Sequence, residues 1–294
     1  MPARLIVNPV AGSGRAKDLY ELLKPSIQAE QNIEVMFTEG PGHATELARE
    51  VSLLEDMTVI SLGGDGTHHE VINGLMPAGK CVFAVIPAGT GNDFVRVLSY
   101  PTTPRAILET ALRGSEARID IGQVSDQYFL SVSGVGFDAE VAGWIHEHGK
   151  TGNSTWVFIR AILRHLVRYR SAAMTLYVDG ISRSERTFLV AVGNTAYYAG
   201  GMHICPNAAY DDNLFDVVWV RDLPRLSVLP LLARVFRGTH IQHPVVQTFQ
   251  TEELSVDGPP EMLVHADGEI VGHLPATFRI HPQAIRVRKG TPNG

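Results

Sequence analysis

The sequence predicts a two-domain α/β protein, with an α/β domain over residues 1–120 and a mainly antiparallel β domain over residues 121–294. In the first third, short apolar runs alternate with segments of helical spacing, which is typical of a parallel sheet with crossover helices. After Asp120, strand-like runs follow one another closely, which indicates a β sandwich or open barrel. A chain of 294 residues is long enough for two such domains.

The first domain is expected to begin with a buried strand, which glycines interrupt before a helix starts. The expected strands are 4–8, 33–38, 58–62 and 82–86, and the expected helices are 16–30, 43–54, 67–75 and 93–98. Thr67 and Glu70 have the spacing of a capping box, which predicts that a helix begins at this point.

The second domain is expected to be a sandwich whose last strand or tail is free to return to the first domain. Its expected strands are 127–132, 173–178, 188–192, 215–220, 254–256, 270–271 and 284–287. One helix interrupts them and places five apolar residues on one face, namely Trp156, Ile159, Leu163, Leu166 and Val167. A second helical stretch at 226–237 contains Pro230, which predicts a bend.

Composition excludes several classes of protein. The chain is 45% hydrophobic and 19% charged, which is the composition of a globular protein. Its net charge of −6 lacks the basic excess of a nucleic-acid binder. The two cysteines, Cys81 and Cys205, lack CxxC spacing, so we expect no structural zinc and a reducing, cytoplasmic location. No signal peptide and no apolar run long enough to span a bilayer is evident, so any membrane contact should be peripheral.

Three glycine-rich turns follow strands of the first domain, at residues 8–14, 63–67 and 87–94. In an open α/β sheet, ligands bind beyond the carboxyl ends of the strands, where all three turns fall. Glycine allows backbone N–H groups to approach an anion, and the following helix contributes its positive N-terminus. One such turn is as well explained by a tight βα connection, but three together favour phosphate binding.

Two common nucleotide motifs are missing. No Walker-A sequence is present, which excludes a P-loop enzyme. Gly12 and Gly14 could start a Rossmann fingerprint, but Lys17 occupies the position of its third glycine.

The complete set of turns resembles the diacylglycerol kinase catalytic-domain family, which includes bacterial lipid kinases, sphingosine kinases and ceramide kinases. The turn at 63–67 alone is also similar to phosphofructokinases and NAD kinases, so the resemblance implies their type of nucleotide-binding domain. The second half agrees with the lipid-kinase branch at residues 134–138, 211–216 and 267–269, so the resemblance covers nearly the whole chain.

The resemblance implies a site between the two domains, with ATP and Mg²⁺ as cofactors. The implied nucleotide-binding residues are Asn8, Pro9, Val10, Ala11, Gly12, Thr38, Gly63, Gly64, Asp65, Gly66, Thr67, His68, His69, Glu70 and Thr90. Asp65 would act on the phosphates through metal and water, and Glu269 would accept the proton of the lipid hydroxyl with Asp267 beside it. A structural Mg²⁺ would take the Asp212 carboxylate and the backbone carbonyls of Ala209 and Leu214.

Local readings remain open for three of these segments. Without the resemblance, residues 211–213 are better explained as a polar turn and residues 267–269 as a hairpin turn. His68 and His69 stand where the family usually has Leu-Asn, which puts the contact expected at position 69 in doubt. Neighbouring residues on a helix point in different directions, so a metal site at this pair is the weaker hypothesis.

Two basic segments are candidates for a membrane-binding surface. Arg160, Arg164, His165 and Arg168 are expected opposite the apolar face of the first helix of the second domain. A solvated helix face explains them slightly better than docking on anionic lipid does. The stretch 225–237 is a second candidate because it mixes leucines with arginines.

The sequence therefore predicts a cytoplasmic, peripherally membrane-associated kinase that transfers the γ-phosphate of ATP to a lipid hydroxyl. Two alternatives remain: an NAD-kinase-like enzyme, and a catalytically silent regulator that binds lipid or nucleotide. We expect a membrane lipid as substrate and no nucleic-acid partner. The sequence leaves open the lipid, the preferred nucleotide, the acyl pocket and whether the protein forms a homodimer.

Overall fold

The computed structural model describes residues 2–291 except residues 55, 77 and 149–153. The chain divides into two compact units. The first contains residues 1–120 and 283–294, and the second contains residues 121–282.

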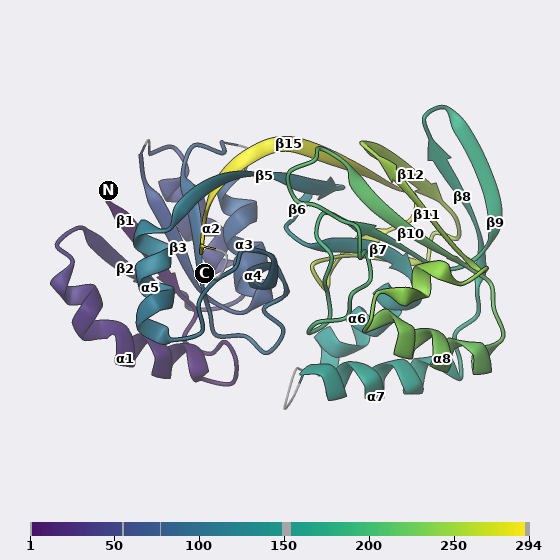
Figure 1. The fold of residues 1–294 in the computed structure, drawn as a ribbon, viewed down its shortest axis with the longest axis horizontal. Helices are drawn as coiled ribbons and strands as arrows, with labels where there is room; N and C mark the ends of the chain where they lie inside the picture. The colour runs from purple at the N-terminus through teal and green to yellow at the C-terminus, as the bar shows by residue number, and fades with distance from the viewer. Residues whose placement is uncertain (1, 55, 77, 149–153, 292–294) are drawn as a thin grey trace. The chain divides into compact units, whose positions relative to one another are not determined.

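A parallel sheet forms the centre of the first unit, with strand order β15-β4-β3-β1-β2 (Figure 1). Its strands are β1 (Ala3–Val7), β2 (Ile33–Phe37), β3 (Thr58–Gly63), β4 (Val82–Pro87) and the end of β15 (Ala276–Lys289). The C-terminal strand joins this sheet because Arg286 and Val287 pair with Val82 and Phe83 of β4.

Helices connect these strands. They are α1 (Arg15–Ala29), α2 (His43–Val51), α3 (Asp65–Leu75), α4 (Asp93–Val97) and α5 (Pro104–Arg113). α1 and α5 share one apolar core with alternate residues of β1, β3 and β4, such as Leu5, Ile60 and Ile86. Ser61 of β3 points away from that core and hydrogen bonds to His68 of α3. The first unit is therefore a sheet with helices on both faces, as its sequence pattern predicts.

The predicted capping box is wrong. α3 begins two residues before Thr67, with Gly64 as its N-cap residue and no side-chain cap. Thr67 accepts a hydrogen bond from Asn8, and the Glu70 carboxylate contacts the start of α2. Both side chains therefore hydrogen bond to other segments, and neither of them caps the N-terminus of α3.

The strands of the second unit are mostly antiparallel. They are the end of β5 (Ser115–Val124), β6 (Gln127–Phe129), β7 (Val132–Gly136), β8 (Ala172–Val178), β9 (Ile181–Gly193), β10 (Phe215–Arg221), β11 (Val246–Thr251), β12 (Glu253–Asp257), β13 (Leu263–Ala266), β14 (Glu269–His273) and the start of β15. The strand order β14-β13-β7-β9-β8-β12-β15 is extended by β10, which pairs with β9 and β11.

Two apolar cores lie against this sheet structure. Val190 and Val192 of β9 belong to the interior shared by the strands. Leu189 and Ala191 alternate with them and face a second core, which α6 (Phe137–His148), α7 (Ser154–Leu166) and α8 (Arg225–Val235) cover. A short helix, η1 (Thr239–Gln242), follows α8. Both faces of β9 are therefore buried, which explains its continuous apolar run from Phe188 to Val192.

The structure corrects two expectations in this unit. The strand predicted at 127–132 is broken into β6 and β7, because Leu130 and Ser131 donate their N–H groups to Asp267. The apolar face predicted for α7 is wrong in part, since Trp156, Leu163 and Val167 are exposed and Ile162 is buried. Sequence patterns did not predict α5 or α6, and the bend expected at Pro230 stays a prediction.

Two further features of the described residues are relevant to function. None of their helices has the length and apolar character needed to cross a bilayer. Cys81 and Cys205 are buried free thiols.

Candidate functional site

The three glycine-rich loops of the first unit meet at the carboxyl ends of β1, β3 and β4. The Asn8 side chain donates a hydrogen bond of 3.0 Å to the Thr67 hydroxyl and so joins the first loop to the second. Gly12 has a φ of +62°, and a Cβ there would clash with the carbonyl oxygen of Ala88 in the third loop. A Cβ at Gly89 would lie only 2.7 Å from the Cα of Gly64. Glycine is therefore required at these close approaches.

The neighbours of these residues line the same three loops. Pro9 and Ala11 are half-buried and Val10 is exposed in the β1–α1 loop. Gly63 ends β3, and its carbonyl accepts a hydrogen bond of 2.6 Å from the N–H of Ala88. Gly66 lies in the first turn of α3, and Thr90 is half-buried in the β4–α4 loop.

Asp65 connects the second and third loops. Its two carboxylate oxygens accept hydrogen bonds of 2.8 and 2.9 Å from the N–H groups of Asn92 and Asp93. Asn92 has a φ of 53°, and its side chain donates a bond of 3.1 Å to the carbonyl of Gly89. Bonds from N–H groups to a charged acceptor are stronger than neutral ones, so Asp65 fixes the shape of the third loop.

Glu70 has the same kind of role for the loop after β2. Its oxygens accept bonds of 3.0 and 3.2 Å from the N–H groups of Gly42 and Ala44. Thr38 is buried at the end of β2, where its N–H donates to the carbonyl of Val7. The structure thus brings the sequence-predicted nucleotide residues of the first unit to one edge of the sheet, and it can offer backbone N–H groups to phosphate there.

The vicinal histidines point to different partners. His68 is fully buried and its Nδ1 lies 2.8 Å from the Ser61 hydroxyl. His69 is also buried and lies near Asn73, whose side chain donates a bond of 2.8 Å to the His69 carbonyl. Among the residues that the structure describes, no cluster of three or more histidine, cysteine or carboxylate side chains could hold a metal.

In the second unit, Glu269 follows a tight turn that Asp267 and Gly268 form between β13 and β14. Both turn residues have positive φ, 52° and 87°, as a two-residue hairpin of type I′ requires. The hairpin reading of this segment is therefore confirmed. Both oxygens of Asp267 accept 2.8 Å bonds, from the N–H groups of Leu130 and Ser131. Asp267 thus fixes the turn, and its part in catalysis stays a prediction.

Helix α6 holds this turn at two points that the sequence analysis missed. His146 places its Nδ1 2.8 Å from Oε2 of Glu269. Nearer the start of the helix, Oδ2 of Asp138 lies 3.3 Å from Nε2 of His265, and both side chains are almost fully buried. Nδ1 of His265 accepts a bond from the N–H of Gly268, so its Nε2 carries the proton and donates it to Asp138.

No local signal identifies these contacts, because α6 itself breaks the usual pattern. It contains Gly143, which disfavours a helix. A Cβ at this position would lie 3.2 Å from Cδ1 of Leu263 and 3.6 Å from Cδ1 of Ile270. The glycine therefore allows α6 to pack closely on β13 and β14.

The predicted metal ligands lie in the turn before β10. Oδ1 of Asp212 accepts a bond of 3.1 Å from the N–H of Leu214, which confirms a local polar turn. Asp216 lies close by, and burial raises the pKa of its carboxyl, with a smaller contribution from the charge of Asp212. The Gln250 amide donates bonds of 3.5 Å to Oδ2 of Asp212 and 3.0 Å to Oδ2 of Asp216, so the two carboxylates lie close together. Carboxylate oxygens are hard donors of the kind that Mg²⁺ prefers. The residues present therefore fit this ion.

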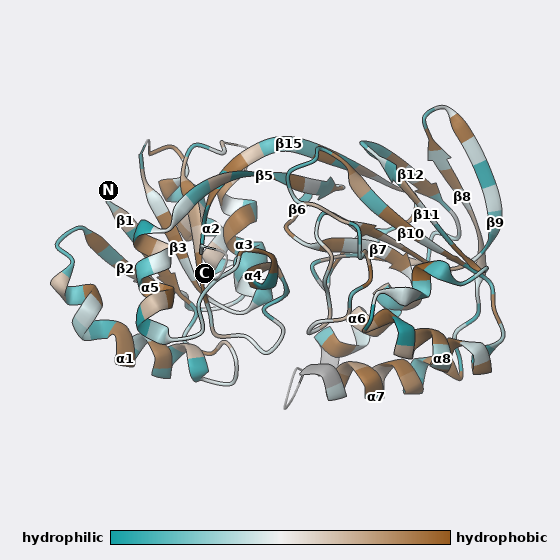
Figure 2. Cartoon of the chain, viewed as in Figure 1, coloured by the Kyte–Doolittle hydropathy of each residue, from teal (hydrophilic) through white to brown (hydrophobic). Residues whose placement is uncertain are grey.

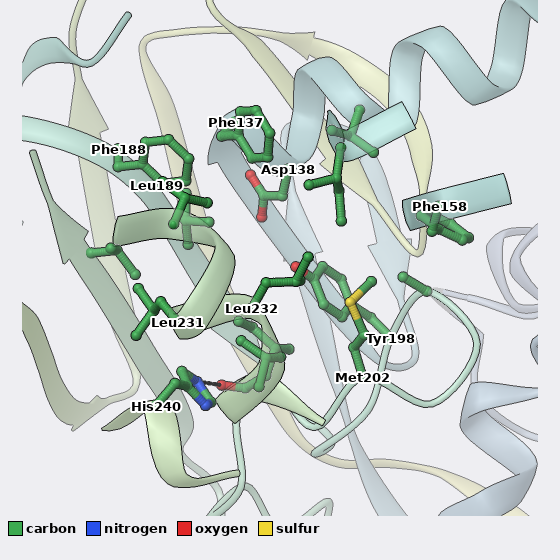
Figure 3. Close-up of a pocket in the computed structure, with 17 residues that line it drawn as sticks. Phe137, Asp138, Phe158, Phe188, Leu189, Tyr198, Met202, Leu231, Leu232 and His240 are labelled. Atoms are coloured by element: carbon green, nitrogen blue, oxygen red, sulfur yellow. Dashed lines mark hydrogen bonds between the residues drawn. The ribbon is translucent and has the colours of Figure 1, made fainter. Parts of the chain in front are cut away.

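An apolar cavity of about 70 Å³ lies under α6, α7 and α8 in the second unit (Figure 3). Tyr198, Ala199 and Met202 line it from the loop after β9. The lining residues with polar groups are Asp138, Tyr198 and His240. Burial lowers the pKa of His240, so this imidazole is neutral at pH 7 and donates its Nε2 hydrogen to the carbonyl of Ile204. The cavity is therefore lined mainly by apolar side chains, and its one carboxylate belongs to the pair that holds the Glu269 turn.

Comparison with known proteins covers both halves of the chain. Residues 2–124 match the model of the diacylglycerol kinase catalytic domain. Residues 131–289 match that of the YegS C-terminal NAD kinase beta sandwich-like domain. A diacylglycerol kinase of Bacillus subtilis (strain 168) is 30% identical over 94% of this chain and 92% of its own. A diacylglycerol kinase of Mycobacterium tuberculosis (strain ATCC 25618 / H37Rv) is 30% identical over 96% of this chain and 93% of its own.

Solved structures share the fold. One protein of Bacillus anthracis strain Sterne superposes with a TM-score of 0.82 at 24% identity, covering 99% of this chain and 95% of that one. A crystal structure of a diacylglycerol kinase from the same strain gives 0.74 at 22% identity, covering 99% and 97%. The domain matches and the relatives at 30% identity show that the chain belongs to the diacylglycerol kinase catalytic-domain family.

Proposed function

We propose that this protein is a lipid kinase that transfers the γ-phosphate of ATP to the hydroxyl of a membrane lipid. One observation carries the choice of a lipid acceptor. In the second unit, the apolar cavity and the Glu269 turn are linked by a short path of hydrogen bonds, from Asp138 to His265 and from His265 to Gly268. An apolar cavity with room for part of a hydrocarbon chain is thus joined by hydrogen bonds to the turn that carries a candidate proton acceptor.

The residues divide the chemistry between the two units. Backbone N–H groups of the glycine-rich loops in the first unit bind the phosphates, and Asp65 holds those loops in shape. Glu269 accepts the proton of the lipid hydroxyl while the hydroxyl oxygen forms a bond to the γ-phosphorus of ATP. The bond between the γ-phosphorus and the oxygen that bridges it to the β-phosphate breaks, which releases ADP. Phosphoryl transfer depends mainly on positioning and charge neutralisation. Mg²⁺, when bound, supplies part of that neutralisation.

An assay with labelled ATP tests the proposal directly. The acceptors would be diacylglycerol, a sphingoid base, ceramide, phosphatidylglycerol and NAD, with products separated by thin-layer chromatography. Label in one lipid product supports the proposal and identifies the acceptor. Label only in the NAD product would show an NAD kinase, and ATP binding without transfer to any acceptor would indicate a catalytically silent regulator.

The contact between His146 and Glu269 predicts a positioning effect. Replacing His146 with Ala removes the donor that orients the carboxylate, and small errors of position are costly in catalysis. We expect kcat on the lipid to fall by about 10–100-fold while KM for ATP is unchanged. His146→Asn should recover most of kcat, because the Asn amide nitrogen lies near the position of Nδ1.

His273 provides the matched control, because it is an exposed histidine on the neighbouring strand β14. His273→Ala should keep the activity of the unchanged protein. If His146→Asn were as slow as His146→Ala, the hydrogen bond to Glu269 would have no positioning role.

The carboxylate pair near β10 predicts that Mg²⁺ stabilises the fold. An ion that binds only the folded state raises its melting temperature, with a size set by concentration and affinity. We expect Mg²⁺ to raise the Tm of the unchanged protein by a few degrees and Asp212→Asn to remove that shift. Asp211→Asn should keep it, because Asp211 is the exposed neighbour. Equal Mg²⁺ shifts in all three proteins would exclude a site at Asp212.

A further inference from the structure

Helices α7 and α8 cover the same cavity. Phe158 and Ile162 of α7 and Val228 and Leu231 of α8 line it (Figure 3). Since these faces point inward, the remaining residues of both helices form the outer surface of this part of the second unit (Figure 1). The two basic segments, which are far apart in the sequence, thus both lie against one cavity.

This outer surface exposes large apolar side chains. Leu226 is 85% exposed and Trp156 is 71% exposed. The exposed apolar residues on or beside the two helices are Trp156, Leu163, Val167, Leu226, Leu229 and Phe236. Figure 2 shows the same apolar character along α7 and α8. Apolar residues gathered in this way on a surface usually mark an interaction site.

Arginines alternate with them. The exposed arginines are Arg160, Arg164, Arg168, Arg225, Arg234 and Arg237. Residues 154–178 and 223–251 contain no aspartate or glutamate, although the whole chain carries a net charge of −6. These two segments are therefore positively charged, whereas the whole chain has a net negative charge. We call the six arginines and six apolar residues together the α7/α8 surface.

We propose that the α7/α8 surface docks on an anionic lipid bilayer. Arginine attracts anionic headgroups, and Trp and Leu side chains enter the region between headgroups and acyl chains. A free polyanion such as nucleic acid offers charge but no apolar phase for Leu226 and Trp156. Arg164 lies 5.8 Å from the Trp144 ring, so its guanidinium is also supported by an aromatic neighbour. The inference rests on the proposed function in one respect, namely that the lipid acceptor of the kinase would lie in this bilayer.

The test reverses charge on the surface and elsewhere. The surface variant carries Arg160→Glu, Arg168→Glu and Arg234→Glu. The matched control carries Arg49→Glu, Arg105→Glu and Arg183→Glu, which changes the net charge equally at exposed positions outside the surface. Both are sedimented with vesicles of phosphatidylglycerol and phosphatidylcholine, and with pure phosphatidylcholine.

We expect the unchanged protein and the control to bind the anionic vesicles more tightly than the neutral ones. The surface variant should partition at least about 100-fold more weakly. A second variant, Trp156→Ser with Leu226→Ser, keeps every charge and should also bind more weakly, including at high salt, where screening leaves mainly the apolar contribution. Circular dichroism and Tm show that each variant is folded.

Several results would overturn the proposal. One is equal sedimentation of the surface variant and the unchanged protein. Another is an equal loss of vesicle binding in the surface variant and the control, and a third is tighter binding to single-stranded DNA than to anionic vesicles.

A kinase assay separates this proposal from the proposed function. With a short-chain form of the acceptor that the labelled-ATP assay identifies, dissolved as monomers, the surface variant should keep full activity, and it should lose activity only on vesicles. Absence of transfer to every acceptor of that assay, in every protein, would end the kinase assignment and leave the sedimentation result valid.

Discussion

Replacing Glu269 with Gln should reduce phosphoryl transfer to the lipid by about 10²–10⁴-fold and leave nucleotide binding unchanged. Gln has nearly the same shape and can still accept the hydrogen bond from His146, so the turn should keep its structure. It cannot take the hydroxyl proton. A positioned general base contributes a factor of this size, so its removal should appear in kcat. Rates of labelled lipid phosphate and calorimetric titration with nucleotide measure the two effects separately.

Glu261 supplies the control for this substitution, because it is an exposed glutamate in the same unit. Glu261→Gln should be as active as the unchanged protein. If Glu269→Gln phosphorylated lipid at the normal rate, another group would have to be the base. Asp267 would then be a weak replacement, because both of its oxygens accept backbone N–H groups.

Replacing Asp65 with Asn should weaken nucleotide binding by about 10–100-fold, because the loop that it holds loses its fixed shape. The carboxylate accepts the N–H groups of Asn92 and Asp93 at 2.8 and 2.9 Å. An Asn side chain offers one oxygen and turns an NH₂ group toward the other N–H. A buried N–H group without its acceptor costs about 1–3 kcal/mol. Hydrogen exchange should therefore become faster in residues 87–94.

The measurement should be made with and without Mg²⁺, since Asp65 has also been assigned a role through metal. Loss of affinity in both conditions, with faster exchange in the loop, supports the structural role. Loss only with Mg²⁺ and unchanged exchange would contradict it and favour the metal role. Asp18→Asn changes an exposed carboxylate on α1 in the same unit and should affect neither quantity.

The α/β half was predicted well because its signals are local. A buried parallel strand is a short apolar run and its helix has regular spacing, so β1 to β4 and α1 to α4 were all expected near their observed bounds. The second half was harder to predict. The break at Leu130 depends on Asp267, which lies 137 positions later in the chain. The helix α6 contains a glycine that only its packing on β13 and β14 explains.

The exposed apolar residues of α7 show the same limit. Spacing groups Trp156, Leu163 and Val167 with the residues expected to be buried, but all three are exposed. The helix buries Leu166 as expected and also Ile162, which the spacing did not indicate. Periodicity indicates that a helix is amphipathic, and the position of the neighbouring core decides which side is buried.

By itself, the sequence determined the fold class, the three glycine-rich turns and the Asp-Gly hairpin before Glu269, because each depends on residues within a few positions of one another. Only the tertiary structure decided which groups donate hydrogen bonds to the carboxylates. Asp65 accepts N–H groups 27 and 28 positions away, and the link from Asp138 to His265 spans 127 positions. Such partners are chosen by packing, since a carboxylate that is partly or fully withdrawn from water must find donors wherever the fold brings them.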